Sequence, residues 1–221
     1  MGEFYLYDAV GIYKNSEELA KYPRQTTSAV GGVRYRDVNE DGIINEKDRT
    51  YMGHAYPSAT YGLKNTFKWK NWDASLLITA QTGGKIYGVV GRSLDRQGML
   101  YNGNVLKKYK NMWFSESDPG DGVTPSALLT SSTEELDNRW LYSSDFLKLK
   151  NITLGYTFKF GNKAFVKTLR TMLSMENIFM IDDYDGGLSP EANTSGLSVS
   201  SYDYGASAQS RTYNLGVSVT F

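Results

Sequence analysis

The last nine residues of the chain alternate strictly between two kinds of side chain. In an extended strand, successive side chains point to opposite faces, so one face of residues 213–221 is apolar and the other carries small polar groups. The apolar face consists of Tyr213, Leu215, Val217, Val219 and Phe221. Such a strand suits the lipid-facing wall of a membrane β-barrel. It suits the last strand of a soluble antiparallel sheet equally well.

Four further segments show the same period of two, which predicts antiparallel strands with one apolar and one polar face. Residues 59–70 and 72–82 form one pair that turns at Asn71, and residues 146–158 and 168–180 form a second. Shorter strands are expected over residues 4–8 and 33–36. In the best-marked segment the apolar face consists of Trp72, Ala74, Leu76, Ile78 and Ala80.

The connections between these strands are unequal in length. Within each pair the connection is short, whereas residues 83–144 and 181–210 are long and rich in Gly, Ser, Asn, Asp and aromatic residues. Soluble domains seldom carry structureless loops longer than about 15 residues. Short turns at one end and long loops at the other are typical of outer-membrane barrels, whose long loops are extracellular. One short loop helix is expected over residues 104–113, where helical spacing aligns Val105, Leu106, Tyr109, Met112 and Trp113.

Composition narrows the function classes. Lys plus Arg and Asp plus Glu number 24 each, so no overall charge favours nucleic acid. The absence of cysteine excludes disulfides, thiolate metal sites and cysteine nucleophiles. The single histidine, His54, is expected in a solvated loop, and no nucleophile motif accompanies it. We therefore predict that the chain is not an enzyme.

Residues 37–48 carry the strongest local chemical motif. Oxygen-bearing side chains at loop positions 1, 3, 5, 9 and 12, with Gly42 at position 6, follow the plan of an EF-hand calcium loop. Asp48 ends the loop where Glu is usual, and its side chain is one methylene shorter. A bidentate contact therefore needs the backbone closer to the ion, or a water in place of one oxygen. The alternative is an Asx-rich turn that folds without metal. The predicted calcium ligands are Asp37, Asn39, Asp41, the Ile43 carbonyl, Asn45 and Asp48.

Aromatic residues in the long loops offer flat surfaces on which sugar rings stack. The candidates for substrate binding are Tyr101, Trp113, Tyr184, Tyr202 and Tyr204. They do not distinguish a transporter from a soluble, calcium-stabilised β-sandwich that binds glycans. The apolar strand faces do distinguish them, because a sandwich buries these faces in a core and a barrel exposes them to lipid.

With these segments in order, the chain resembles the C-terminal part of SusC/RagA-type TonB-dependent transporters. The resemblance covers nearly the whole chain, in family order and at family-like spacing. The matching residues are 33–42, 48–50, Gly53, Pro57, 60–62, 139–141, 146–156, 176–179, 190–191 and 211–221.

The resemblance implies an all-β fold, in which an antiparallel meander forms the C-terminal strands of a large transmembrane β-barrel. It implies location in the outer membrane of a Gram-negative cell and TonB-energised uptake of an oligosaccharide or peptide. The implied partners are a SusD-type surface lipoprotein, membrane lipid and the TonB complex, which engages the N-terminal part of such transporters. Phe221 and the apolar row before it then serve as the assembly signal. Residues 1–221 are expected to be a partial barrel without plug or N-terminal strands, unable to transport alone.

Overall fold

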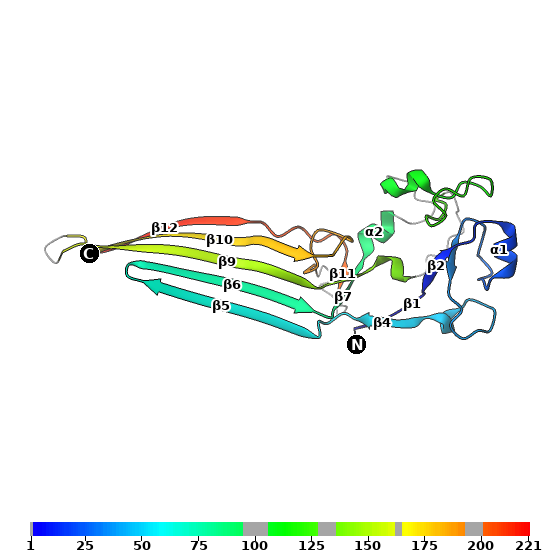
Figure 1. Cartoon of the computed structure of the whole chain (residues 1–221), viewed down its shortest axis with the longest axis horizontal. Coiled ribbons are helices and arrows are strands. Elements are labelled where there is room, and N and C mark those ends of the chain that lie inside the picture. The colour runs from blue at the N-terminus through cyan, green and yellow to red at the C-terminus, as the bar shows by residue number, and fades with distance from the viewer. Residues whose placement is uncertain (1, 95–105, 128–135, 162–164, 193–200) are drawn as a thin grey trace.

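The computed structural model describes residues 2–94, 106–127, 136–161, 165–192 and 201–221. The molecule is elongated, with a long sheet at one end and a group of short strands, helices and loops at the other (Figure 1). We call the second part the loop body; it comprises the described residues of 2–58, 83–145 and 183–211. The two parts differ in where they place their apolar side chains.

The long sheet has five antiparallel strands in the order β12-β10-β9-β6-β5. This confirms the predicted antiparallel meander. A tight turn at Lys70, whose φ is 54°, joins β5 to β6. The strands are β5 (Ala59–Trp69), β6 (Trp72–Thr82), β9 (Phe146–Lys159), β10 (Thr168–Asp182) and β12 (Thr212–Thr220).

The pairing register places the apolar rows of all five strands on one face. Leu154 in β9 lies opposite Ala74 in β6 and Leu173 in β10, and Leu173 lies opposite Leu215 in β12. Directly paired residues share a face of the sheet, so these rows are continuous. A register shift between Glu176 and Phe179 interrupts the ladder. In the described residues β5 and β12 each pair on one side only, so these five strands form an open sheet.

The loop body contains three small sheets. Two are antiparallel pairs, β1 (Glu3–Leu6) with β4 (Thr50–His54) and β2 (Ala9–Ile12) with β3 (Val33–Tyr35). The third has the order β11-β7-β8, in which β11 and β7 are parallel. Its strands are β7 (Lys85–Gly88), β8 (Leu141–Ser143) and β11 (Tyr202–Asp203).

Helices in the described residues are short. Two are α-helices, α1 (Ser16–Lys21) and α2 (Val89–Leu94), which the sequence pattern did not predict. The others are the 3₁₀ helices η1 (Glu46–Asp48), η3 (Lys107–Asn111) and η4 (Asn138–Trp140). No helix in this part of the chain has the length and apolar character needed to cross a membrane.

The predicted loop helix over residues 104–113 is shorter and differently wound than expected. A 3₁₀ helix covers Lys107–Asn111, while residues 104 and 105 lie outside the described residues. Leu106, Tyr109 and Met112 pack together with Ala127, as their spacing predicted. Trp113 is not part of this cluster, and its indole N–H donates to the carbonyl of Lys14 at 2.9 Å. His54 also differs from expectation, since it ends β4 rather than lying in a loop.

The buried apolar clusters found in the described residues all lie in the loop body. The largest joins β1, β7 and η4, and its members are Phe4, Leu6, Ala55, Tyr87 and Trp140. Segments far apart in sequence therefore share a core within the loop body.

Candidate functional site

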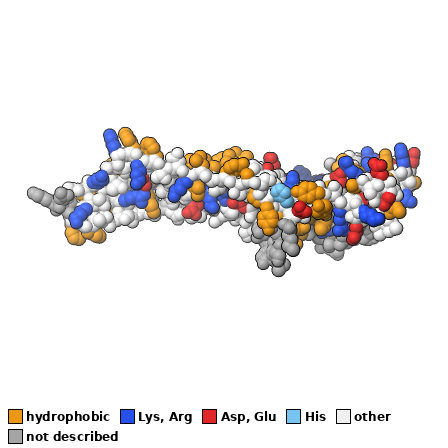
Figure 2. Space-filling view, turned by 90° about the horizontal axis from the view of Figure 1, so that it is seen from below, with side chains coloured by type: hydrophobic (Ala, Val, Ile, Leu, Met, Phe, Trp, Pro, Cys, Tyr) orange, Lys and Arg blue, Asp and Glu red, His pale blue; other side chains and the backbone are white. Residues whose placement is uncertain are grey.

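One face of the five-stranded sheet is apolar and exposed. On β12, Tyr213, Leu215 and Val217 are 65%, 79% and 63% exposed. Figure 2 views the molecule from the side of β5. Apolar side chains gather along one margin of the sheet, and charged side chains are densest over the far end of the loop body (Figure 2). Soluble proteins rarely expose so large a continuous apolar surface to water. Lipid hydrocarbon solvates such a surface, and the outward-facing band of a membrane barrel has this pattern.

The predicted assembly residues lie together at the edge of this face. Tyr213, Leu215, Val217 and Val219 form one row of β12, and Phe221 follows directly after the strand. The Phe221 ring packs against Phe165 from the β9–β10 turn, with ring centroids 5.1 Å apart. Their role as an assembly signal stays a prediction.

The opposite face of the sheet is polar and carries a cross-strand ion pair. Arg170 in β10 donates to Asp73 in β6, with the Nη2–Oδ2 distance 2.6 Å. The pair spans the middle strand β9 at Gly155. A Cβ at Gly155 would lie 2.7 Å from Asp73 and 2.8 Å from Arg170, so only glycine leaves room for this contact. This polar, paired surface is what the inside of a barrel requires.

A second polar contact fastens the loop body to the sheet. Lys148 of β9 is only 3% exposed, and its ammonium donates to Glu191 at 2.6 Å and also to the side-chain oxygen of Gln209. Lysine is seldom so buried without a partner. The sequence pattern gave no sign of this contact, because Lys148 sits in an ordinary polar position of the strand.

The calcium-type loop is folded around its own side chains. Gly42, with φ at 82°, donates its N–H to Asp37 Oδ2 at 2.8 Å. Asp48 is fully buried, and its two oxygens accept the backbone N–H groups of Val38 at 2.9 Å and Asn45 at 2.8 Å.

Asp41 is exposed and takes two hydrogen bonds. Its Oδ1 accepts the N–H of Ile43 at 2.9 Å, and its Oδ2 accepts from the Asn39 amide. The Ile43 N–H, and next the Asn39 amide, hold the pKa of the Asp41 carboxyl below its usual value. These hydrogen bonds hold residues 37–48 in a compact loop, and binding of calcium by its predicted ligands stays a prediction.

The predicted substrate aromatics occupy different surroundings. Tyr184 is buried and donates its hydroxyl to Asp203 at 2.7 Å, and burial followed by this bond raises the pKa of the phenol. Tyr202 is half-buried and stacks on Tyr204, which is 60% exposed. Trp113 lies apart from these tyrosines against Gly31, and Tyr101 lies outside the described residues. Binding of substrate by these side chains stays a prediction.

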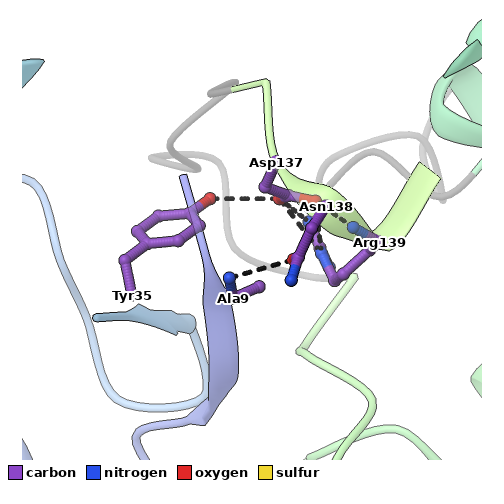
Figure 3. Close-up of polar contacts among 5 residues, drawn as sticks. All are labelled: Ala9, Tyr35, Asp137, Asn138 and Arg139. Atoms are coloured by element: carbon purple, nitrogen blue, oxygen red, sulfur yellow. Dashed lines mark hydrogen bonds and ion pairs between the residues drawn. The ribbon is translucent and has the colours of Figure 1, made fainter. Parts of the chain in front are cut away.

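A polar hub that the sequence did not reveal joins Ala9 and Tyr35 to the segment 137–139 (Figure 3). Asp137 is fully buried and accepts from Arg139 at 2.8 Å and from the Tyr35 hydroxyl at 3.3 Å. Asn138 accepts the N–H of Ala9 at 3.0 Å. The contacts of Tyr35 with Asp137 and of Ala9 with Asn138 join residues more than a hundred positions apart in the chain, so no local pattern predicts them.

Comparison with known proteins identifies relatives along the full chain, although no family model matches it. TonB-dependent receptor P3 of Formosa agariphila is 27% identical over 235 residues, which cover 100% of this chain and 22% of the relative. TonB-dependent receptor SusC of Bacteroides thetaiotaomicron is 25% identical over 84% of this chain and 17% of its own length. The chain thus spans about a fifth of the curated relatives it matches.

A solved structure has the same fold. The structure of the RagAB peptide importer in the open-open state matches with a TM-score of 0.76 and 20% identity, over 99% of this chain and 22% of that chain. The fold and the relatives agree with the apolar and polar faces of the sheet. The predicted resemblance to the C-terminal part of SusC/RagA-type TonB-dependent transporters is therefore confirmed, and with it the location in the outer membrane of a Gram-negative cell.

Proposed function

We propose that this chain is part of a TonB-energised importer that carries an oligosaccharide or peptide across the outer membrane. The observation that carries the proposal is the sheet with an exposed apolar face and a paired polar face. Its relatives are named TonB-dependent receptors, and the structural neighbour is named a peptide importer. The importer acts with a SusD-type lipoprotein over its extracellular mouth, and TonB engages its N-terminal part.

Transport requires a closed barrel, and the five long strands of the described residues leave two edges of the sheet open. The open edges of β5 and β12 each present unpaired backbone groups. In hydrocarbon each unsatisfied group costs several kcal/mol, so a spanning sheet must close on itself. We therefore propose that the chain works as the C-terminal portion of a larger closed barrel and does not transport alone.

The soluble β-sandwich alternative is less well supported. A sandwich packs two sheets face to face about 10 Å apart. In the described residues no second sheet covers the apolar face formed by β5, β6, β9, β10 and β12. Enzymatic activity is also not proposed, because the named relatives are receptors and importers.

The test is uptake by cells that carry or lack the gene. We expect deletion to abolish growth on one class of oligosaccharide or peptide, and inactivation of TonB to have the same effect. An antibody against residues 195–221 should detect a detergent-extracted outer-membrane protein much heavier than 24.8 kDa. A 24.8 kDa species that is monodisperse in buffer without detergent would favour the sandwich and overturn the proposal.

We also propose that residues 37–48 bind calcium as a structural cofactor. Asp37 supports this, because its Oδ1 is buried and has no hydrogen-bond partner within the described residues. No set of three or more His, Cys, Asp or Glu side chains in the same residues lies close enough to form a metal site. The coordination would therefore depend on Asn39, Asn45 and the Ile43 carbonyl as well as on the carboxylates.

Calorimetric titration of the native protein in detergent tests the calcium site. We expect one calcium ion bound at millimolar concentration or below, and no binding by the Asp37→Asn variant. Glu40→Gln is the matched control, since Glu40 is an exposed acid in the same loop but not at a ligand position. Absence of uptake by the wild-type protein would show that the loop is an Asx-rich turn that needs no metal.

A further inference from the structure

A pocket in the loop body lies between β2, β3, α1 and the segment around Gly122. Its volume is about 420 Å³, within the range of roughly 300–1,000 Å³ typical of small-molecule sites. Aliphatic side chains of Val10, Val33 and Val123 form part of its wall. Four charged residues also line it, namely Lys14, Glu18, Arg34 and Arg139, and we call this cavity the Arg34 pocket.

Arg34 in β3 lines the pocket and has one donor without an acceptor in the described part of the chain. Its Nε is buried and has no acceptor among the described residues. The guanidinium lies over the ring of Tyr22, 4.2 Å from the centroid, which holds it flat. Across the β2–β3 ladder its partner is Gly11, where a Cβ would lie 3.7 Å from Arg34 Nη2. The glycine therefore leaves open space beside the guanidinium.

The charges in the wall favour an anion. Arg139 lines the pocket but is already bonded to Asp137 through both Nε and Nη2. Lys14 and Arg34 remain, against the single carboxylate of Glu18, so two positive charges face one negative charge. Glu18 is itself occupied, since it accepts the backbone N–H of Lys14 at 3.0 Å. The wall thus keeps an excess of one positive charge.

We propose that the Arg34 pocket binds a carboxylate group of the imported cargo. A carboxylate accepts two parallel hydrogen bonds from a guanidinium, and the Arg34 side chain lines the pocket. Lys14 adds a second cation at the rim, beside Gly122, where a Cβ would lie 3.5 Å from its Nζ. The carboxylate comes from either an acidic sugar or a peptide. This inference rests on the proposed function for the source of the ligand, not for the chemistry of the pocket.

Calorimetry of the native protein in detergent, with three small probes, tests this proposal. We expect glucuronate, N-acetyl-glycylglycine or both to bind, and neutral glucose not to bind. Binding of glucuronate alone assigns an acidic sugar, binding of the peptide alone assigns a peptide, and binding of both shows that the carboxylate is what the pocket recognises. Failure of both anions to bind at millimolar concentration would overturn the proposal.

Matched variants locate the binding. Arg34→Gln should weaken binding at least about tenfold, because the charge and the fork of donors are lost. Arg36→Gln is the control, since Arg36 is exposed, lies two residues away and pairs with Asp8 outside the pocket. Equal binding by the wild type and Arg34→Gln would overturn the assignment.

If Arg34→Gln does not fold, Lys14→Met serves in its place and should weaken binding severalfold; unchanged binding would again overturn the assignment. Uptake is measured separately. Normal uptake without carboxylate binding would contradict this site and leave the proposed function standing.

Discussion

The sheet and the loop body use the same kinds of side chain in opposite ways. On the sheet, Leu154 is 48% exposed and Leu215 is 79% exposed, whereas in the loop body Leu6 and Trp140 are 2% and 4% exposed. Burial of apolar area in water stabilises the loop body. The sheet does not need such burial, because lipid tails solvate its outer face. One chain is thus built for two solvents, and the boundary falls where the long strands end.

The largest expected effect is loss of the loop-body core. Trp140→Ala removes the aromatic centre of the cluster with Phe4 and Tyr87, and we expect a loss of about 3–5 kcal/mol in the free energy of unfolding. Urea titration of the native protein in detergent measures it. Leu188→Ala is the control, since Leu188 is 69% exposed and its truncation should change stability by about 0.5 kcal/mol or less. Equal effects at the two positions would mean that the loop body has no core.

The next largest effect is expected from a charge placed on the apolar face of the sheet. Leu154→Arg places a charge on the apolar face, which should cost about 2–4 kcal/mol in a bilayer if the residue lies near mid-depth. Thr153→Arg, one residue away on the polar face, should cost far less. Folding into lipid vesicles under increasing urea measures both. A soluble sheet would tolerate arginine at the exposed Leu154, so a mild effect there would contradict the lipid-facing assignment.

The sheet could be predicted from the sequence, because its signal is local. Alternation with a period of two depends only on neighbouring residues, and each long strand spans at least nine residues, enough to show it despite breaks such as Asn65. The register then follows, since a slip by one residue would turn Leu173 or Leu215 to the polar face. The loop helix was predicted in part, because the spacing of Tyr109 and Met112 suits a 3₁₀ turn as well as an α-helix.

The loop body could not be predicted in the same way. Its strands are two to five residues long, and only β1 and β3 coincide with the short strands expected over residues 4–8 and 33–36. Its polar contacts join distant positions, such as Tyr35 with Asp137 and Lys148 with Glu191. The calcium-type loop is the exception, because its spacing lies within twelve consecutive residues. Arg34 fell inside a stretch matched to the family, but only the pairing of β2 with β3 places it opposite Gly11.

A smaller effect concerns the contact that joins the two regions. Lys148→Met removes the ammonium that Glu191 and Gln209 share, leaving a partly buried carboxylate without its cation. We expect a loss of about 1–3 kcal/mol, confined to the segment around Glu191. Limited proteolysis of the native protein should show faster cleavage there. Lys150→Met is the control, because Lys150 is exposed in the same strand and should leave the cleavage rate unchanged.

The smallest effect is the pH dependence of the calcium-type loop. Because the folded loop holds the pKa of Asp41 below its ordinary value of 3.8, the unfolded loop binds more protons in the interval between the two values. The contribution of Asp41 to loop stability is therefore fully present above pH 3.8 and is lost as the pH falls through the lower, folded value. Protection of the Ile43 amide from hydrogen exchange, corrected for the intrinsic exchange rate, should fall in that interval. Asp41→Asn should abolish the step, since its amide oxygen accepts the same bond without titrating. A step of equal size in that variant would mean that another carboxylate holds the turn, and Asp37 and Asp48 would then be replaced in turn to identify it.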